Sequence, residues 1–275
     1  MLKKIIFLLS VAVILISCNT NPPTSLEIVP TGNIVLNFSV DNSASISVAN
    51  KVVLLEDFAN VSCVPCVISN KIIESLTEVT YGRSKLVAVK FPTNFPAPND
   101  LFYLAAKEIC DARISYYNVF FAPTTVIDGI LKPISTDSNS VKAAVDSRLS
   151  ITPRFNINVA ATLEGDYSVD VNVKFVDTSS INMSDLVIHT VLTETDIEFE
   201  QAPGSNGETK FYDVTRLMLP TKDGTPIRQL IDQGELTFTF EDALLSSWNL
   251  EKLNFVVFIQ NKSTKEVYQT GSTFD

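Results

Sequence analysis

The stretch Asp57-Phe58-Ala59-Asn60-Val61-Ser62-Cys63-Val64-Pro65-Cys66 decides how this sequence is interpreted. It follows the apolar run 52–55, which predicts a buried strand, and it precedes a segment with helical periodicity. A strand that leads to Cys-x-x-Cys at a helix start is typical of thiol redox chemistry, because the N-terminus of a helix stabilises a thiolate. The stretch therefore predicts that Cys63 and Cys66 form a redox-active pair.

Strands and helices alternate around this stretch over residues 51–150. The predicted strands are 51–58, 86–91 and 123–127, and the predicted helices are 66–79, 101–116 and 141–149. Such alternation is the signature of βαβ units, in which helices flank a central sheet. In the first helix, apolar residues at helical spacing predict the buried face: Ile68, Ile72, Leu76 and Val79. Residues 51–150 are therefore expected to form an α/β domain.

Beyond residue 153 the hydrophobic periodicity changes to two. Apolar and polar residues alternate over 155–163 and 169–175, on either side of a turn at 164–166. Further short apolar runs follow at 186–192, 236–240 and 255–259. Several short strands without a long helix predict an all-β sandwich of the immunoglobulin type over 153–275, with a boundary near 150–154.

The N-terminus has the features of an export signal. The basic residues Lys3 and Lys4 precede the apolar run 5–16, which is too short to span a membrane as a helix. Leu15-Ile16-Ser17-Cys18 resembles the lipobox of bacterial lipoproteins, so residues 1–17 are predicted as a signal peptide and Cys18 as the lipidated residue that anchors the chain to a membrane. The alternatives are a plain signal peptide or a buried cysteine. Because no Asp follows Cys18, analogy with bacterial lipoproteins favours the outer membrane, on its periplasmic or its surface face.

The segment between the lipidation site and the first domain is predicted in two parts. Residues 18–30 contain prolines and small polar residues, which favour a flexible tether. Residues 31–50 hold two alternating runs, 34–40 and 44–48, separated by Asp41-Asn42-Ser43. This pattern predicts a β-hairpin, and the alternative is an addition to the edge of a later sheet.

Charge and cysteine content limit the partners. The formal net charge of −10 argues against nucleic acid as a ligand. With Cys18 acylated, three thiols remain, and an oxidising envelope allows Cys63 and Cys66 to form a disulfide. Cys110 is then unpaired and is expected to fill a helix face. A zinc site needs four ligands, for which Cys110 and His189 are the only obvious additions, so no metal and no cofactor are predicted.

The cysteine motif resembles that of the thioredoxin superfamily. The family motif, Asp-Phe-Trp-Ala-x-Trp-Cys-x-Pro-Cys, is matched by Asp57, Phe58, Ala59, Cys63, Pro65 and Cys66. The chain departs from it at Val61 and Ser62, where the family usually has an aromatic residue before the first cysteine. The downstream Ala122-Pro123-Thr124 resembles the proline loop of the same family.

This resemblance implies roles for four residues. Cys63, the more exposed cysteine, would be the attacking thiolate, and Cys66 would resolve the mixed disulfide. Asp57, buried beneath the pair with a raised pKa, would take the proton of Cys66. Pro123 would be cis and would face the cysteines. The alternatives are a surface carboxylate at Asp57 and a trans proline at Pro123.

Over residues 50–275 the chain also resembles an outer-membrane lipoprotein family of Bacteroidetes-type bacteria that joins a thioredoxin-like domain to a β-rich C-terminal domain. The resemblance lies in Val53-Leu54-Leu55-Glu56-Asp57-Phe58, Ala112-Arg113-Ile114-Ser115-Tyr116-Tyr117, Val214-Thr215-Arg216-Leu217-Met218-Leu219-Pro220 and Val257-Phe258-Ile259-Gln260-Asn261. Two functions follow as hypotheses. One is an envelope thiol-disulfide oxidoreductase acting on envelope or surface proteins with thiols or disulfides. The other is a binding lipoprotein that uses the fold as a scaffold.

Overall fold

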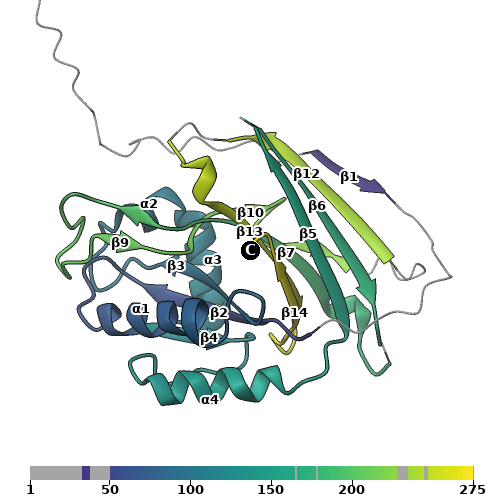
Figure 1. Cartoon of the computed structure of the whole chain (residues 1–275), viewed down its shortest axis with the longest axis horizontal. Helices are drawn as coiled ribbons and strands as arrows, with labels where there is room; N and C mark the ends of the chain where they lie inside the picture. Colours follow the sequence, from purple (N-terminus) through teal and green to yellow (C-terminus); the bar gives the residue numbers. More distant parts are fainter. Residues whose placement is uncertain are drawn as a thin grey trace, which may run out of the picture.

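A mixed sheet of eight strands includes strands from both sides of residue 150 (Figure 1). The computed structural model describes residues 33–37, 50–164, 166–177, 179–227, 235–244 and 247–274. Seven strands cross the sheet in the order β14 (Val267–Ser272), β13 (Leu253–Asn261), β7 (Leu186–Glu194), β10 (Val214–Leu219), β3 (Leu86–Pro92), β2 (Val53–Ala59) and β4 (Thr124–Ile127). The eighth, β11 (Thr225–Pro226), pairs with β7. Strands β3 and β10 thus join the two parts of the chain.

The part of this sheet formed by β2, β3 and β4 has the predicted central-sheet arrangement. Strands β2 and β3 are parallel, and β4 is antiparallel to β2. Helices α1 (Cys66–Glu74) and α4 (Ser138–Leu149) cover one face, and α3 (Lys107–Tyr117), preceded by the short α2 (Leu101–Ala105), lies against the other. All three strands are buried along their length, as expected for a sheet covered on both faces. The prediction of a central sheet flanked by helices is therefore confirmed.

The first helical segment buries only part of the predicted face: Leu76 is 3% exposed, and Ile72 packs against the core. Ile68 is 53% exposed and Val79 is 82% exposed, so the prediction is wrong for both residues. The side chains that pack inward from α1 include Cys66 and Ile73, which are seven residues apart, and Ile68 lies away from this stripe. After Glu74 the helix continues as a π-helical segment, η1 (Ser75–Thr80). Its wider turn shifts the later side chains relative to a constant α-helical period.

A second sheet packs on the C-terminal part of the first (Figure 1). Its antiparallel order is β1 (Asn33–Asn37), β12 (Glu235–Ala243), β6 (Asp166–Phe175) and β5 (Phe155–Leu163). The core between the sheets takes buried residues from both, among them Tyr167, Val169, Val171, Leu186, Ile188, Phe255 and Val257. The prediction of an immunoglobulin-like sandwich is not confirmed, because β7, β10, β13 and β14 extend the sheet that contains the cysteine motif. Alternation identifies strands but not the sheet they join.

The N-terminal predictions fall mainly outside the described residues. This applies to the signal peptide (1–17), to the tether (18–30) with Cys18, and to the second arm of the hairpin predicted over 31–50. The described strand β1 pairs with β12 at a sheet edge, which is the edge addition that the sequence allowed as an alternative. Among the described residues, no helix has the length and apolar character needed to cross a membrane.

A small hairpin lies between β7 and β10 in the sequence and brings residues from beyond 153 to the cysteine motif. It consists of β8 (Ile197–Glu198) and β9 (Lys210–Phe211), joined by the long connection 199–209. Its aromatic side chains Phe199 and Phe211 pack edge-on against Phe102 of α2. Val61, two residues before Cys63, belongs to the same apolar cluster. The hairpin is thereby held beside the turn that carries the cysteines.

Candidate functional site

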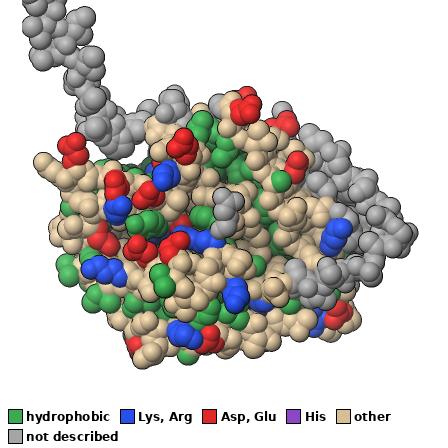
Figure 2. Space-filling view, viewed as in Figure 1, with side chains coloured by type: hydrophobic (Ala, Val, Ile, Leu, Met, Phe, Trp, Pro, Cys, Tyr) green, Lys and Arg blue, Asp and Glu red, His purple; other side chains and the backbone are tan. Residues whose placement is uncertain are grey.

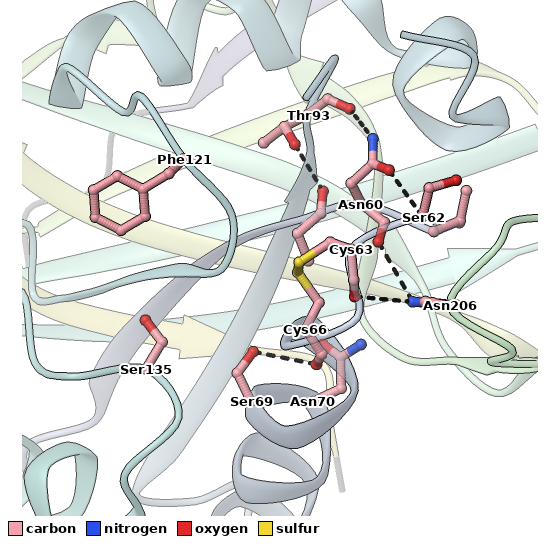
Figure 3. The surroundings of a disulfide bond; sticks show 12 residues. Asn60, Ser62, Cys63, Cys66, Ser69, Asn70, Thr93, Phe121, Ser135 and Asn206 are labelled. Atoms are coloured by element: carbon pink, nitrogen blue, oxygen red, sulfur yellow. Dashed lines mark hydrogen bonds between the residues drawn. A yellow bond between two sulfur atoms is a disulfide. The ribbon is translucent and has the colours of Figure 1, made fainter. Parts of the chain in front are cut away.

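Cys63 and Cys66 form a disulfide at the start of α1, directly after β2 (Figure 3). Asn60 holds the intervening turn. Its side-chain oxygen accepts a hydrogen bond from the Ser62 N–H at 2.8 Å, and its amide donates to the Thr93 carbonyl at 2.6 Å. The pair therefore lies at the strand-to-helix transition that the sequence predicts.

Both cysteines of the pair are buried. Cys63 is 2% exposed and Cys66 is 0% exposed, because Ala59 and Ala122 pack against them. Cys63, predicted as the more exposed cysteine, is thus more exposed than Cys66 by a very small margin in this disulfide-bonded form. A sulfur atom that attacks the disulfide needs a line of approach, so a partner has to displace neighbouring atoms before it reaches Cys63.

The proline loop lies beside the disulfide, with an exposed apolar surface next to it. The Ala122–Pro123 peptide is cis, so the trans alternative is wrong, and Pro123 directly precedes β4. Phe120 is 80% exposed and Phe121 is 67% exposed. In Figure 3 Phe121 lies on one side of the disulfide, and Asn206 lies on the other. Exposed apolar patches are a common feature of interaction sites.

Asp57 is buried, so the alternative of a surface carboxylate is wrong. It is 1% exposed and accepts a hydrogen bond from the Lys90 ammonium at 2.7 Å. The Thr125 hydroxyl lies 3.5 Å from its other oxygen. Alternate residues of a strand share a face, so Asp57 lies on the same face as Ala59, which packs against both cysteines. Lys90 thus places a compensating positive charge below the disulfide.

The connection 199–209 contacts the cysteine turn from the side opposite Phe121. The Asn206 amide lies 3.5 Å from the Cys63 carbonyl, and the Asn206 N–H donates to the Val61 carbonyl at 3.2 Å. The Ser205 N–H donates to the Ser62 hydroxyl at 3.3 Å. These contacts cover one side of the turn with backbone from the C-terminal part of the chain.

Glu208 links this connection to the charges below the disulfide. Its carboxylate accepts hydrogen bonds from the Asn206 amide at 2.7 Å and from the Asn70 amide at 2.8 and 2.9 Å. The Asn70 oxygen in turn accepts from the Lys90 ammonium at 2.5 Å. A continuous polar series therefore runs from the connection through Asn70 and Lys90 to Asp57.

A second buried ionic cluster lies on the other face of β2, at the preceding residue. The Glu56 carboxylate is fully buried and accepts from the Arg113 guanidinium at 2.9 Å and from the Tyr117 hydroxyl at 2.5 Å. Gln260 of β13 contacts both Arg113 (3.1 Å) and Tyr117 (2.7 Å). Burial, followed by the nearby Glu56 charge, raises the pKa of Tyr117 well above its ordinary value, so the phenol stays a donor.

The remaining sequence candidates lie apart from this site. Cys110 is a free, buried thiol in a small apolar cluster with Tyr103 and Ala106, and burial raises its pKa well above the usual value. His189 lies in β7 against the ring of Phe258. Within the described residues, no group of three His, Cys, Asp or Glu side chains is arranged to hold a metal ion.

Lys90, Asn70, Asn206 and Glu208 are site residues that sequence reasoning does not identify. Lys90 lies within an ordinary buried strand, and Asn70 lies one turn after Cys66. The segment around Asn206 has only the Gly, Ser and Asn content of a turn. Nothing local in the sequence indicates that this turn lies on the cysteine motif, because 143 residues separate Cys63 from Asn206.

Comparison with known proteins gives a family match over more than half of the chain. The model of the family described as "Outer membrane protein Omp28" matches residues 110–273. The matched region includes the proline loop, the β8–β9 hairpin and the C-terminal strands. No curated protein matches the sequence.

Two of the similar solved structures share the fold at low sequence identity. HBP35 of Porphyromonas gingivalis is similar at 14% identity and a TM-score of 0.66, over 82% of this chain and 75% of that one. Protein AGR_C_4864 from Agrobacterium tumefaciens is similar at 11% identity and a TM-score of 0.53, over 83% and 95%. A domain of the outer membrane lipoprotein Omp28 from P. gingivalis aligns at 15% identity and a TM-score of 0.25, over 44% and 88%.

Proposed function

Because the chain belongs to the Omp28 family of outer membrane proteins, we propose that it is a lipid-anchored thiol-disulfide oxidoreductase of the cell envelope, with Cys63 and Cys66 as its redox pair. The observation that carries the proposal is the placement of the disulfide at a helix start, beside the cis Ala122–Pro123 peptide and above the Asp57–Lys90 ion pair. A helix N-terminus and a nearby cation both favour a thiolate.

The chemistry of this pair is an exchange of two electrons. In the reducing direction the Cys63 thiolate attacks a partner disulfide, forms a mixed disulfide and releases one partner thiolate. Cys66 then transfers its proton to Asp57, and the resulting thiolate attacks the Cys63 sulfur. The Cys63–Cys66 disulfide forms and the second partner thiolate leaves, so the pair loses two electrons and the partner gains two. The reverse sequence oxidises a partner dithiol.

The surface near the disulfide supports a protein partner. Val64 is 67% exposed beside Cys63, and Phe120 and Phe121 add apolar area at the proline loop. On the face shown in Figure 2, acidic and basic side chains are interspersed among the described residues without a broad basic patch. Together with a net charge of −10, this supports envelope or surface proteins with thiols or disulfides as partners rather than nucleic acid.

Lipidation of Cys18 supplies the membrane anchor in this proposal. Removal of residues 1–17 and acylation of Cys18 place the folded part in the envelope, where disulfides persist. Mass spectrometry of the N-terminal peptide tests the step directly: an acylated Cys18 is expected, and an unmodified one contradicts the anchor. Protease treatment of intact cells then distinguishes the periplasmic from the surface face.

Trapping of partners tests the oxidoreductase. Full-length Cys66→Ser, carrying Cys110→Ala to remove the third thiol, is expected to accumulate mixed disulfides through Cys63 in cells. The matched control Cys63→Ser should accumulate far fewer, since it lacks the attacking sulfur. Non-reducing electrophoresis followed by mass spectrometry identifies the partners. Equal trapping by the two variants, or none by either, counts against redox exchange with proteins.

Burial of the disulfide favours a second function, a binding lipoprotein in which the bond is a structural staple. Exposures of 2% at Cys63 and 0% at Cys66 restrict access to the sulfurs. The reduction potential separates the two functions. Structural disulfides generally lie below about −300 mV, whereas catalytic pairs span roughly −270 to −120 mV. Partner binding that survives in the Cys63→Ser, Cys66→Ser double variant supports the scaffold.

A further inference from the structure

The cysteine site receives two polar side chains from the C-terminal part of the chain. We infer that Asn206 and Glu208 are positioning residues of the redox pair: they hold the Cys63 turn and fix the Asn70 amide that keeps Lys90 on Asp57. Neither residue touches the sulfurs, so they act through their neighbours. The inference deepens the proposed oxidoreductase and rests on it.

The connection 199–209 fits closely on the turn that carries the cysteines. A Cβ atom built on Gly204 lies 2.1 Å from the Val61 carbonyl oxygen, so the two backbones are in direct contact there. Asn206 contributes its main-chain N–H to the Val61 carbonyl and directs its amide at the carbonyls of Asn60 and Cys63, each at 3.5 Å. The connection therefore supports the turn that places Cys63.

The orientation of the Asn70 side-chain amide is set by its two charged neighbours. A carboxylate only accepts hydrogen bonds and an ammonium only donates them. The Asn70 amide nitrogen must therefore face Glu208 and its oxygen must face Lys90, which is the arrangement found. Without the Glu208 carboxylate the Asn70 nitrogen loses this acceptor, so the amide can swing from its present position and the Lys90 ammonium that donates to its oxygen can move with it.

Lys90 lies between the strand and the helix that flank the disulfide. Lys90 lies between Asp57, on the face of β2 that carries Ala59, and Asn70, four residues after Cys66 on α1. The cavity next to it is also lined by four other charged side chains, Glu74, Arg83, Asp213 and Lys210 of β9. Arg83 is committed to Asp213 at 2.7 Å. Lys90 is thus the cation that offsets Asp57 below the redox pair.

This arrangement predicts the direction in which loss of Glu208 changes the reactivity of Cys63. Loss of the Glu208 anchor releases Lys90 from Asp57, leaves a less compensated carboxylate below the pair, and destabilises the Cys63 thiolate. A purely through-space effect acts in the opposite direction, because removal of a negative charge stabilises a nearby thiolate. Positioning and simple charge removal therefore predict opposite changes in the reactivity of reduced Cys63.

The experiment measures alkylation of reduced Cys63 by iodoacetamide at pH 7 in the full-length protein, in a Cys110→Ala background. Glu208→Ala is expected to slow alkylation about three- to tenfold, and Glu208→Gln less, since it keeps one acceptor for Asn70. Glu200→Gln, which removes an exposed carboxylate from the same hairpin, is the matched control and should leave the rate unchanged. In an Asn70→Ala background Glu208→Ala should have a smaller effect than in the wild type, because the path through Asn70 is already broken and only the contact with Asn206 is left to lose.

Each outcome decides between the interpretations. A faster reaction in Glu208→Ala, an unchanged rate, an equal effect of Glu200→Gln, or full additivity with Asn70→Ala overturns the positioning role. Thermal unfolding identifies a variant that fails to fold, and Glu208→Gln then provides the test. Because alkylation needs no partner, a positive result alongside failed partner trapping rejects the oxidoreductase while the positioning role stands. The converse pair of results rejects only the positioning role.

Discussion

Glu56 and Asp57 are consecutive residues of β2, yet they take part in opposite kinds of polar cluster. Successive side chains of a strand point to opposite faces, so Glu56 meets α3 whereas Asp57 lies on the α1 side. The Glu56 cluster is closed, since Arg113, Tyr117 and Gln260 satisfy one another inside the core. Its members lie away from the disulfide and from the surface, which is the arrangement of a structural brace.

The Asp57 cluster is open at one end. From Asp57 it passes through Lys90 and Asn70 to Glu208, which is only partly buried, in a connection that also contacts the Cys63 turn. The same chemistry, a buried carboxylate with a cation, is therefore linked in this cluster to the turn that carries the disulfide and to the surface. The two clusters have similar ion-pair geometry and differ in where their hydrogen-bonded paths lead, so we propose that this path, rather than the geometry of the pair, indicates which carboxylate takes part in function.

The largest effect is expected on stability, when the Glu56 cluster is broken. Arg113→Met leaves Glu56 buried without its cation, and removal of one partner of a buried ion pair typically costs about 3–5 kcal/mol. Urea unfolding should show this loss of stability, while the reduction potential of the disulfide changes little. A loss below about 1 kcal/mol, or a marked change of potential, would break the distinction between the two clusters.

The next effect is expected on the rate of disulfide exchange, when Asp57 of the open cluster is changed. Asp57→Asn removes the proposed proton acceptor for Cys66, and positioned general bases contribute about a hundredfold or more to rate. Stopped-flow measurement of the resolution of a mixed disulfide on Cys63 should show this decrease. Glu56→Gln is the mirror control, because it should lower stability and leave resolution nearly unchanged. Equal kinetic effects of the two variants would remove Asp57 from the mechanism.

The predictable features of the site are those with local signals. Strand β2, the cysteines at the helix start, the burial of Asp57 and the cis bond before Pro123 all follow from short stretches or from the motif resemblance. The place of Lys90 in the site cannot be predicted from local sequence, because it depends on the strand register that places Lys90 beside Asp57. The same holds for Glu208, since only tertiary packing brings its hairpin to α1.

The lack of a local signal also explains why the immunoglobulin-like sandwich predicted over 153–275 is not confirmed. The sequence pattern of β7 predicts one more alternating strand of a sandwich. It does not indicate that the neighbouring strand β10 pairs with β3. A single pairing, Val214 with Lys90, joins the β-rich part to the sheet of the cysteine motif. Non-local pairings of this kind leave no periodic signature in either strand.

A smaller effect is expected where the connection meets the turn. Gly204→Ala places a methyl group 2.1 Å from the Val61 carbonyl oxygen, so the two segments must separate. Reduction of the disulfide by dithiothreitol should accelerate a few-fold, and stability should fall by about 1–3 kcal/mol as for other overpacked sites. Gly207→Ala is the matched control, because its Cβ has open space around it and only its positive φ of 84° opposes the change. Similar reduction rates in both variants would mean that the contact does not limit access.

The smallest effect is a pH dependence of stability that comes from His189, which is influenced by the charge of Arg113 in the Glu56 cluster. Burial, and then the charge of Arg113, lower the pKa of His189 well below its usual value, so the folded protein keeps this imidazole neutral. The unfolded chain takes up a proton near pH 6.5 and the folded chain does not, so this contribution is complete above about pH 6.5 and is lost as pH falls below it. Between pH 6.5 and 5.5 the free energy of unfolding should fall by about 1 kcal/mol from this residue. As His189 is the one histidine of the sequence, His189→Leu should flatten the slope in urea titrations over this range, and an unchanged slope would place its origin elsewhere.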